Sequence, residues 1–314
     1  MAEINNHKLW VDKYRPKTLD EYVWSDESQK NQVSNWIKEK HVPNILLTGP
    51  PGTGKTSIVK CILNELGVHS SDIRFINGSH TNGVDDIRSL SNFAETMPDG
   101  EFRYVVIDEC DFLSINAQAA LRNMIETYTS ICRWFLTANI ENKILPALKS
   151  RTQGFKIEKL DRDLFLSRIA NILISEEIEL TEENIEVLDE YVTVTYPDLR
   201  KCINMLQQNC IDKKLNRPST NSTSDTSDYM VNVVNCFKQG KIKEAREIIC
   251  ANIRSDEYEE MYKLLYRNLN WWGNTDDQQN QAVVIIANRL RDHTICADPE
   301  ICMSACIIEL SMIQ

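Results

Sequence analysis

Residues 49–56 have the sequence GPPGTGKT, which matches the phosphate-binding pattern G-x-x-x-x-G-K-[ST] in full. Glycines in such a segment let backbone N–H groups point toward phosphate oxygens. Lys55 would contact the β- and γ-phosphates, and the Thr56 hydroxyl would coordinate Mg²⁺. We therefore predict that ATP and Mg²⁺ bind here, with the nucleotide contacted by Gly52, Thr53, Gly54, Lys55, Thr56 and Ser57.

Two adjacent carboxylates, Asp108 and Glu109, follow the apolar residues 104–107. A carboxylate at the exposed end of a strand can contact the same Mg²⁺, and the next one can polarise the attacking water. An acidic pair by itself is usually only a solvated strand end. In one domain with a phosphate-binding loop, it predicts that Asp108 binds the metal and Glu109 is the catalytic base.

Three further polar residues could act on the γ-phosphate. Asn139 follows the apolar residues 134–136 and could orient the water, although an Asn in a turn is more often structural. Arg151 lies in a predicted turn and could reach a neighbouring subunit's nucleotide as an arginine finger. Arg200 could contact the chain's own nucleotide. Most arginines, however, simply lie at a surface.

These residues need elements that position them, and the pattern of apolar residues predicts those elements. Short apolar strands at 44–48, 74–77, 104–108 and 133–137 alternate with helices at 26–40, 57–66, 84–95 and 116–128. Alternating strands and helices are typical of an α/β domain with a parallel sheet covered on both faces. We predict that this domain spans residues 1–159.

After about residue 160 the sequence predicts helices only, at 164–176, 182–192 and 198–208, and again from 230 onward with breaks near Gly240, Gly273 and Pro299. Residues 216–228 are polar and rich in Ser and Thr, which favours a linker, or else a long surface loop. The predicted organisation is a small helical domain at 160–215, a linker at 216–228 and a helical end domain at 229–314.

Composition excludes several classes of protein. The net charge of −11 argues against a chain that coats DNA through general basicity, so any DNA-binding surface would be local or shared between subunits. No apolar run has membrane-spanning length, and the sequence does not begin with a secretory signal, so we expect a cytoplasmic protein without a membrane partner. The ten cysteines lack metal-site spacing and are expected to be reduced and mostly buried.

The motifs together resemble those of AAA+ ATPases of the sliding-clamp-loader group, over almost the whole chain. The motifs are WVDKYRP at 10–16, GPPGTGKT, IDE at 107–109, TAN at 137–139, Ser150–Arg151 and PDLRK at 197–201. The chain is similar to replication factor C small subunits and, more closely, to the ATPase subunit of T-even-type bacteriophage loaders. The resemblance implies a helical lid domain at 160–215 and an oligomerising collar at 229–314.

The resemblance also implies roles for residues outside those motifs. The entry segment would pack on the adenine through Val11, Asp12, Lys13, Tyr14 and Val23. Asn77 would hold the catalytic Glu inactive until DNA binds, and Arg122 would couple neighbouring subunits. Arg88, Ser114 and Gln118 would lie along the DNA path. Phe93 and Met97 fall where the family contacts the clamp, although a core position is as plausible for both.

The function implied is that of an ATPase subunit that opens a ring-shaped polymerase clamp and loads it onto primer–template DNA. Its partners would be the sliding clamp, primer–template DNA and other subunits in a five-subunit assembly. It would lie in the host cytoplasm if viral, or in the nucleus if eukaryotic. Thr152 replaces the family's usual Cys after Ser150–Arg151. A related branch-migration helicase or origin initiator, or an inactive scaffold subunit, remains an alternative.

Overall fold

The computed structural model of the protein describes residues 9–211, 213–218 and 229–313. The described residues form two compact units. The first contains residues 9–168 and 197–201, and the second contains residues 169–196 and those from 202 onward. Each unit is described by itself below.

A five-stranded parallel sheet forms the centre of the first unit, with the strand order β2-β3-β4-β1-β5. The strands are β1 (Ile45–Thr48), β2 (Ile73–Asn77), β3 (Arg103–Asp108), β4 (Cys132–Ala138) and β5 (Gln153–Lys156). Because all strands run in the same direction, the carboxyl ends of β1, β3 and β4 share one edge, and their amino ends share the other.

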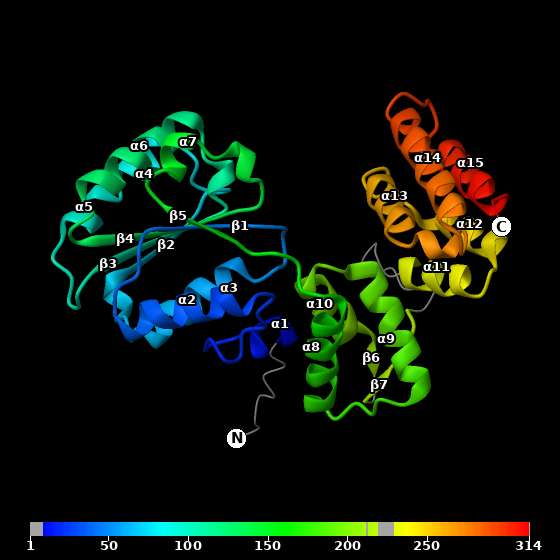
Figure 1. Ribbon diagram of the computed structural model, residues 1–314, viewed down its shortest axis with the longest axis horizontal. Helices are drawn as coiled ribbons and strands as arrows, with labels where there is room; N and C mark the ends of the chain where they lie inside the picture. Colours follow the sequence, from blue (N-terminus) through cyan, green and yellow to red (C-terminus); the bar gives the residue numbers. More distant parts are fainter. Residues whose placement is uncertain (1–8, 212, 219–228, 314) are drawn as a thin grey trace, which may run out of the picture. The chain divides into compact units, whose positions relative to one another are not determined.

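Helices cover both faces of this sheet (Figure 1). The helical elements of the first unit are α1 (Trp10–Lys13), α2 (Glu27–Lys38), α3 (Lys55–Glu65), η1 (Ser70–Asp72), α4 (Val84–Arg88), α5 (Ser91–Glu95), η2 (Cys110–Phe112), α6 (Ile115–Thr127), η3 (Glu141–Lys143) and α7 (Pro146–Lys149). Successive strand side chains point to opposite faces. Leu46 of β1 therefore packs under α4–α7, whereas Ile45 and Leu47 pack under α2 and α3. The predicted α/β class is confirmed.

Two features of this unit differ from the sequence-based expectation. The helix predicted over 84–95 is divided at Ser89, because the Ser89 and Ser91 hydroxyls bond the carbonyls of Asp86 and Arg88 and compete with helical bonding. Strand β5 was not predicted. It is an edge strand that buries only Phe155, so its sequence lacks an apolar run.

The second unit is helical apart from one small hairpin. Its elements are the second half of α8 (Arg162–Ser175), α9 (Glu182–Thr195), most of α10 (Leu199–Asn209), β6 (Cys210–Ile211), β7 (Lys214–Leu215), α11 (Tyr229–Lys238), α12 (Ile242–Asn252), α13 (Tyr258–Arg267), η4 (Leu269–Trp271), α14 (Asp276–His293) and α15 (Pro299–Ser311). The prediction that strands end near residue 160 is wrong for the hairpin β6–β7, which is too short to give a periodic signal. The helical breaks at Gly240, Gly273 and Pro299 are confirmed.

Part of the predicted linker packs within the second unit. Arg217 donates to both carboxylate oxygens of the buried Glu190 on α9, at 2.8 and 2.9 Å, and the Pro218 carbonyl accepts from Asn232 on α11. Residues 219–228 of that segment lie outside the described residues. The boundaries at 159, 215 and 228 stay predictions.

Two smaller expectations concern the chemistry of the whole chain. All ten cysteines are free, and seven of them are buried, as expected from their spacing. Among the described residues, no helix combines the length and apolar composition that a membrane span requires.

Candidate nucleotide site

The phosphate-binding segment connects β1 to α3 at the carboxyl edge of the sheet. Gly49 begins the turn and donates its N–H to the Ala138 carbonyl of β4 at 3.3 Å. A Cβ at Gly49 would lie 2.1 Å from the Ile157 carbonyl, so only glycine fits. Gly54, with φ near +90°, is the N-cap of α3 and starts the helix two residues earlier than predicted.

Lys55 is buried within this turn. Its ammonium donates to the carbonyls of Gly49 at 2.9 Å and Pro50 at 2.7 Å, so the turn itself holds the side chain in the folded position. Burial lowers the pKa of Lys55 to about 8, while the charges of Asp108, Asp111 and Glu109 act in the opposite direction. A partly desolvated cation in the first turn of helix α3 is suited to phosphate oxygens.

Thr56, Asp108 and Thr137 form a hydrogen-bonded group beside Lys55. The Thr56 hydroxyl lies 2.8 and 3.0 Å from the two carboxylate oxygens of Asp108. The Thr137 hydroxyl donates to Asp108 Oδ1 from the neighbouring strand β4. Mg²⁺ commonly binds one or two protein oxygens and completes its coordination shell with water and phosphate. The Thr56 hydroxyl and the Asp108 carboxylate fit this preference. No larger cluster of potential metal ligands occurs in the described part of the chain.

Glu109 has an unusual backbone conformation that fixes where its side chain begins. Its φ of 56° and ψ of 46° are left-handed, which is uncommon for a residue other than glycine. The Glu109 N–H donates to the Thr137 hydroxyl at 3.0 Å. Thr137 therefore contacts both acidic residues of the pair, through its bond to Asp108 and its bond to the Glu109 backbone.

Asn77 ends strand β2 at this edge, and Asn139 directly follows strand β4. Asn77 is paired in register with Asp108, and its side-chain oxygen accepts from the Ser79 N–H at 2.8 Å and the Ser79 hydroxyl. The buried carboxylate of Asp111 accepts from the N–H groups of Asn139 and Ile140, both at 3.2 Å. Asp111 thus fixes the turn that carries Asn139.

The entry segment lies in the same unit, and Val11, Asp12 and Lys13 belong to the short helix α1. Asp12 pairs with Arg15 at 3.1 Å, and the Tyr14 carbonyl accepts from Arg168 at 2.8 Å. Val23 is partly buried.

Tyr22, the neighbour of Val23, is buried against the phosphate-binding turn. It donates its hydroxyl to the Thr53 carbonyl at 3.2 Å, and its ring would lie 3.0 Å from a Cβ at Gly54. Burial raises the pKa of Tyr22. Tyr22 therefore supports the turn from the side of the entry segment.

The PDLRK segment approaches the phosphate-binding turn. The charge of Arg200 acts to lower the pKa of Lys55, and a Cβ at Gly52 would lie 2.1 Å from Asp198 Oδ1. Both segments belong to the first unit. The predicted role of Arg200 toward a nucleotide is compatible with this position.

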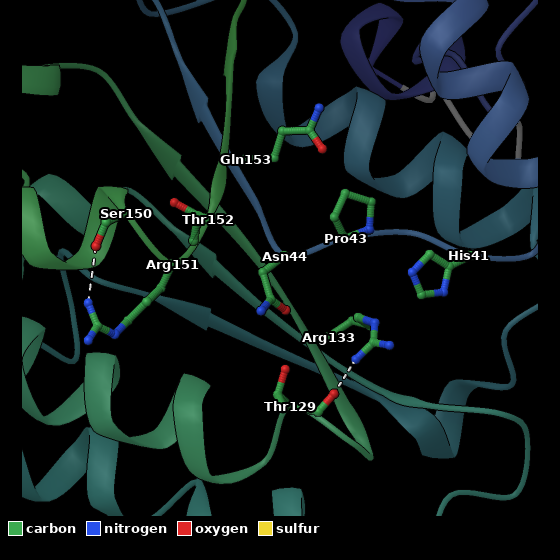
Figure 2. Close-up of a pocket in the computed structure, with 9 residues that line it drawn as sticks. All are labelled: His41, Pro43, Asn44, Thr129, Arg133, Ser150, Arg151, Thr152 and Gln153. Atoms are coloured by element: carbon green, nitrogen blue, oxygen red, sulfur yellow. Dashed lines mark hydrogen bonds between the residues drawn. The ribbon is translucent and has the colours of Figure 1, made fainter.

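Arg151 lies at the opposite, amino edge of the sheet, in the turn between α7 and β5. Its Nε and Nη2 contact Glu126 Oε1 on α6, and its Nη1 donates to the Ala147 carbonyl at 2.7 Å and to Ser150 Oγ at 3.1 Å. Figure 2 shows the guanidinium turned toward Ser150. It does not contact the phosphate-binding turn of its own chain.

The residues predicted to face DNA differ in their accessibility. Arg88 is exposed and pairs loosely with Asp85 at 3.5 Å, and exposed Ser114 is the N-cap of α6. Arg122 on α6, which was predicted to couple neighbouring subunits and not to face DNA, donates to its neighbour Asn123.

Gln118 is 2% exposed and bonds the backbone of Leu113, Lys143 and Leu145. Its burial argues against a direct contact with DNA, because its amide is already used in joining α6 to the segment before α7.

The two predicted clamp-contact residues, Phe93 and Met97, also differ in their exposure to solvent. Phe93 packs against the core with the Arg103 guanidinium 4.9 Å from its ring, whereas Met97 is 76% exposed. Only Met97 presents an apolar surface to solvent. The roles of all these residues toward nucleotide, DNA or clamp stay predictions.

Sequence reasoning missed Thr137, Asp111 and Tyr22, which position the predicted residues. Thr137 could have been noticed as a polar residue near the end of an otherwise apolar strand, since buried polar groups need partners. Asp111 stands two residues after Glu109. No sequence signal identifies Tyr22.

Residues 45–159 match the family described as ATPase family associated with various cellular activities (AAA). The replication factor C small subunit of Archaeoglobus fulgidus is 32% identical over 254 residues, which are 78% of this chain and 78% of that protein. The corresponding subunit of Staphylothermus marinus is 32% identical and is matched over 84% of this chain and 77% of its own length. The fold is similar to the Thermotoga maritima RuvB Holliday junction branch migration motor, with a TM-score of 0.55, 17% identity and coverage of 80% of this chain and 79% of that one.

Proposed function

We propose, because this chain belongs to the replication factor C small-subunit family, that it is the ATPase subunit of a sliding-clamp loader. As a member of that family with an AAA domain, the chain binds nucleotide and hydrolyses ATP. The proposal adds the use of that ATPase: opening the ring-shaped polymerase clamp and placing it on primer–template DNA. The observation that carries it is the arrangement of Lys55, the Thr56–Asp108 pair and Glu109 at one sheet edge, with Arg151 at the other.

The residues at the carboxyl edge divide the work on the nucleotide. Lys55 and the backbone of the glycine-rich turn would bind the phosphates, and Thr56 with Asp108 would hold Mg²⁺. The ion, when bound, neutralises charge on the phosphate oxygens. Glu109 would accept a proton from the attacking water, and Asn139 would orient that water. Thr137 would keep the two carboxylates in their relative positions.

Arg151 would complete the site of a neighbouring copy. It lies at the amino edge of the sheet and makes no contact with its own phosphate-binding turn. A head-to-tail assembly, in which one face of a subunit meets a different face of the next, would place it on the neighbour's nucleotide. A guanidinium there stabilises the charge of the transition state. We propose a five-subunit assembly that acts in the cytoplasm.

The proposed DNA and clamp contacts use exposed groups of the first unit. Arg88 and the N-terminus of α6 at Ser114 would contact DNA phosphates. Met97 would contact the clamp. The closer resemblance of this chain to the ATPase subunit of bacteriophage loaders stays a prediction.

The likeness to the branch migration motor concerns the fold alone. Among the described residues, the region from 229 to 313 contains helices and no strand. A winged-helix DNA-binding domain, which such motors typically carry at this end, contains β-strands. The loader function therefore accounts for this region better.

The proposal is tested by measuring ATP hydrolysis by the assembled complex with and without primer–template DNA and the matching clamp. We expect DNA and clamp together to stimulate hydrolysis, and a Lys55→Ala assembly to show none. Clamp loading should be followed in the same samples by transfer of labelled clamp onto DNA. An active ATPase that neither DNA nor clamp stimulates would contradict the loader function while leaving the ATPase in place.

A further inference from the structure

A pocket of about 470 Å³ opens at the amino edge of the sheet, where β1, β4 and β5 begin. Figure 2 shows the nine side chains that line it: His41, Pro43, Asn44, Thr129, Arg133, Ser150, Arg151, Thr152 and Gln153. The chain has 46 Asp and Glu residues and a net charge of −11, yet the lining contains two arginines and a histidine and no acid. An acid-free, cationic lining on an acidic protein is suited to an anion.

Arg133 is the fixed cation of this pocket. Its guanidinium stacks on the Phe102 ring at 3.7 Å, and its Nη1 donates to the Thr129 and Cys132 carbonyls at 2.5 and 3.3 Å. Within the described residues, Nε and Nη2 have no hydrogen-bond partner and no carboxylate lies within ion-pair distance. Burial lowers the pKa of Arg133. A partly desolvated, rigid guanidinium with one donor edge unused is suited to a phosphate oxygen.

Asn44 adds an oriented neutral donor. Its side-chain oxygen accepts from the Trp134 N–H at 3.0 Å, and its backbone carbonyl accepts from the Gln153 N–H at 2.7 Å. These bonds fix the amide, so its Nδ2 group, which has no partner among the described residues, is presented as a donor. In Figure 2 the Asn44 side chain lies between Arg151 and Arg133 in the view.

Arg151 is the movable cation. Glu126, which is outside the lining, contacts the same Nε–Nη2 edge by which a guanidinium makes paired bonds to phosphate. The pair is partly exposed, with side-chain exposures of 29% and 49%. Exposed pairs of this kind are weak, so a phosphate group can replace the carboxylate.

The pocket cannot serve the chain's own nucleotide. The phosphate-binding turn follows the carboxyl end of β1, whereas Asn44 precedes its amino end. A four-residue strand separates the two by roughly 13 Å. The sheet lies between the two sites, and both faces of that sheet are packed with helices.

We propose that this pocket receives the terminal phosphate groups of a nucleotide bound to a second copy of the chain, with Arg133 and Asn44 as fixed donors and Arg151 as the donor released from Glu126. The inference rests on the proposed head-to-tail assembly and adds three residues to it. Arg133 and Asn44 contact the phosphates, and Glu126 holds the finger before they arrive.

Asn44→Asp tests the pocket with little change in the fold. The carboxylate keeps the acceptor for the Trp134 N–H but replaces the Nδ2 donor with a negative oxygen. We expect the DNA- and clamp-stimulated ATPase rate of the assembly to fall about tenfold or more, because a charge-assisted donor is replaced by repulsion. Binding of a fluorescent ATP analogue to the chain's own site should be unchanged. The matched control, Asn31→Asp, makes the same change at an exposed position of α2 and should leave the rate unchanged.

Mixed assemblies then show which chain's nucleotide the pocket serves. Lys55→Ala subunits have an intact pocket but a defective phosphate-binding turn. Asn44→Asp subunits have an intact phosphate-binding turn but a defective pocket. An equal mixture of the two should regain roughly a quarter of the wild-type rate. In such a mixture about a quarter of the head-to-tail interfaces join an intact phosphate-binding turn to an intact pocket. Arg133→Lys, which keeps the charge but not the planar donor edge, should show a smaller loss and the same rescue.

Normal activity of Asn44→Asp, or a loss without rescue, overturns the inference. Arg151→Ala in the same mixture separates the two proposals. If Arg151→Ala is rescued and Asn44→Asp is not, the proposed role of the pocket is wrong, but the proposed role of Arg151 as an arginine finger is kept. If neither is rescued, the proposal that the amino edge of the sheet acts on a neighbouring subunit's nucleotide is wrong.

Discussion

The two edges of the five-stranded sheet hold their charged side chains in different ways. At the carboxyl edge, Lys55, Asp108 and Glu109 are fixed by backbone carbonyls, by the Thr137 hydroxyl and by a left-handed backbone. At the amino edge, Arg151 is held by a partly exposed ion pair to Glu126. The first edge is preorganised within one chain, whereas the cation of the second edge would have to exchange partners in the proposed assembly. The ATPase would therefore be limited by assembly at the amino edge.

Glu109→Gln should produce the largest effect and tests the preorganised edge. The amide cannot accept a proton, so we expect the hydrolysis rate to fall by about 100-fold or more while ATP binding is kept. Phosphate release and fluorescent-nucleotide binding measure the two quantities. Glu39→Gln, a change at an exposed glutamate after α2, should be neutral. Near-normal hydrolysis by Glu109→Gln would remove Glu109 from its proposed role.

Thr137→Val tests whether the hydroxyl organises that edge. Valine has the same shape but leaves Asp108 without one donor and the Glu109 N–H without its acceptor. One buried group left without its partner costs about 1–3 kcal/mol, so if one of the two losses is felt in the transition state we expect a roughly 10- to 100-fold lower rate and a higher Mg²⁺ requirement. Thr137→Ser keeps the hydroxyl and should recover most of the rate. Equal defects in the two variants would indicate a packing role.

The lowered pKa of Lys55 gives a smaller, proton-linked effect. With a pKa of about 8 in the free protein, Lys55 is mostly neutral above that pH, and phosphate binding favours its charged form. Binding of Mg-ATP at about pH 8.8 should therefore take up a fraction of a proton, and the uptake should decline toward pH 7. Calorimetry in two buffers with different ionisation enthalpies measures it. The same uptake in a Lys55→Met variant would assign the proton to another group.

Glu126→Gln tests the amino edge and should produce the smallest change. Removing the carboxylate frees Arg151 at the cost of a weak pair, so we expect the DNA-independent ATPase rate of the assembly to rise by about two- to fivefold. The stimulation by DNA and clamp should become correspondingly smaller. A fall in the unstimulated rate would mean that Glu126 orients the finger instead of restraining it.

The order of elements and the carboxyl-edge chemistry could be predicted from the sequence because their causes are local. GPPGTGKT needs glycines for its turn, and the strands are short apolar runs bounded by polar residues. Two structural features could not be predicted because they have no periodic pattern of apolar residues. Strand β5 buries a single large side chain, and the α4–α5 break depends on two serine hydroxyls.

Sequence by itself determined that a phosphate-binding turn, an acidic pair and an arginine would belong to one α/β domain. Only the tertiary structure decided that Thr137 bonds both members of the acidic pair, that Gln118 is buried and that Arg151 faces Glu126. The physical reason is that each of these contacts joins residues on different strands and helices. Their meeting depends on strand order, register and helix packing, and no spacing along the chain encodes those relations directly.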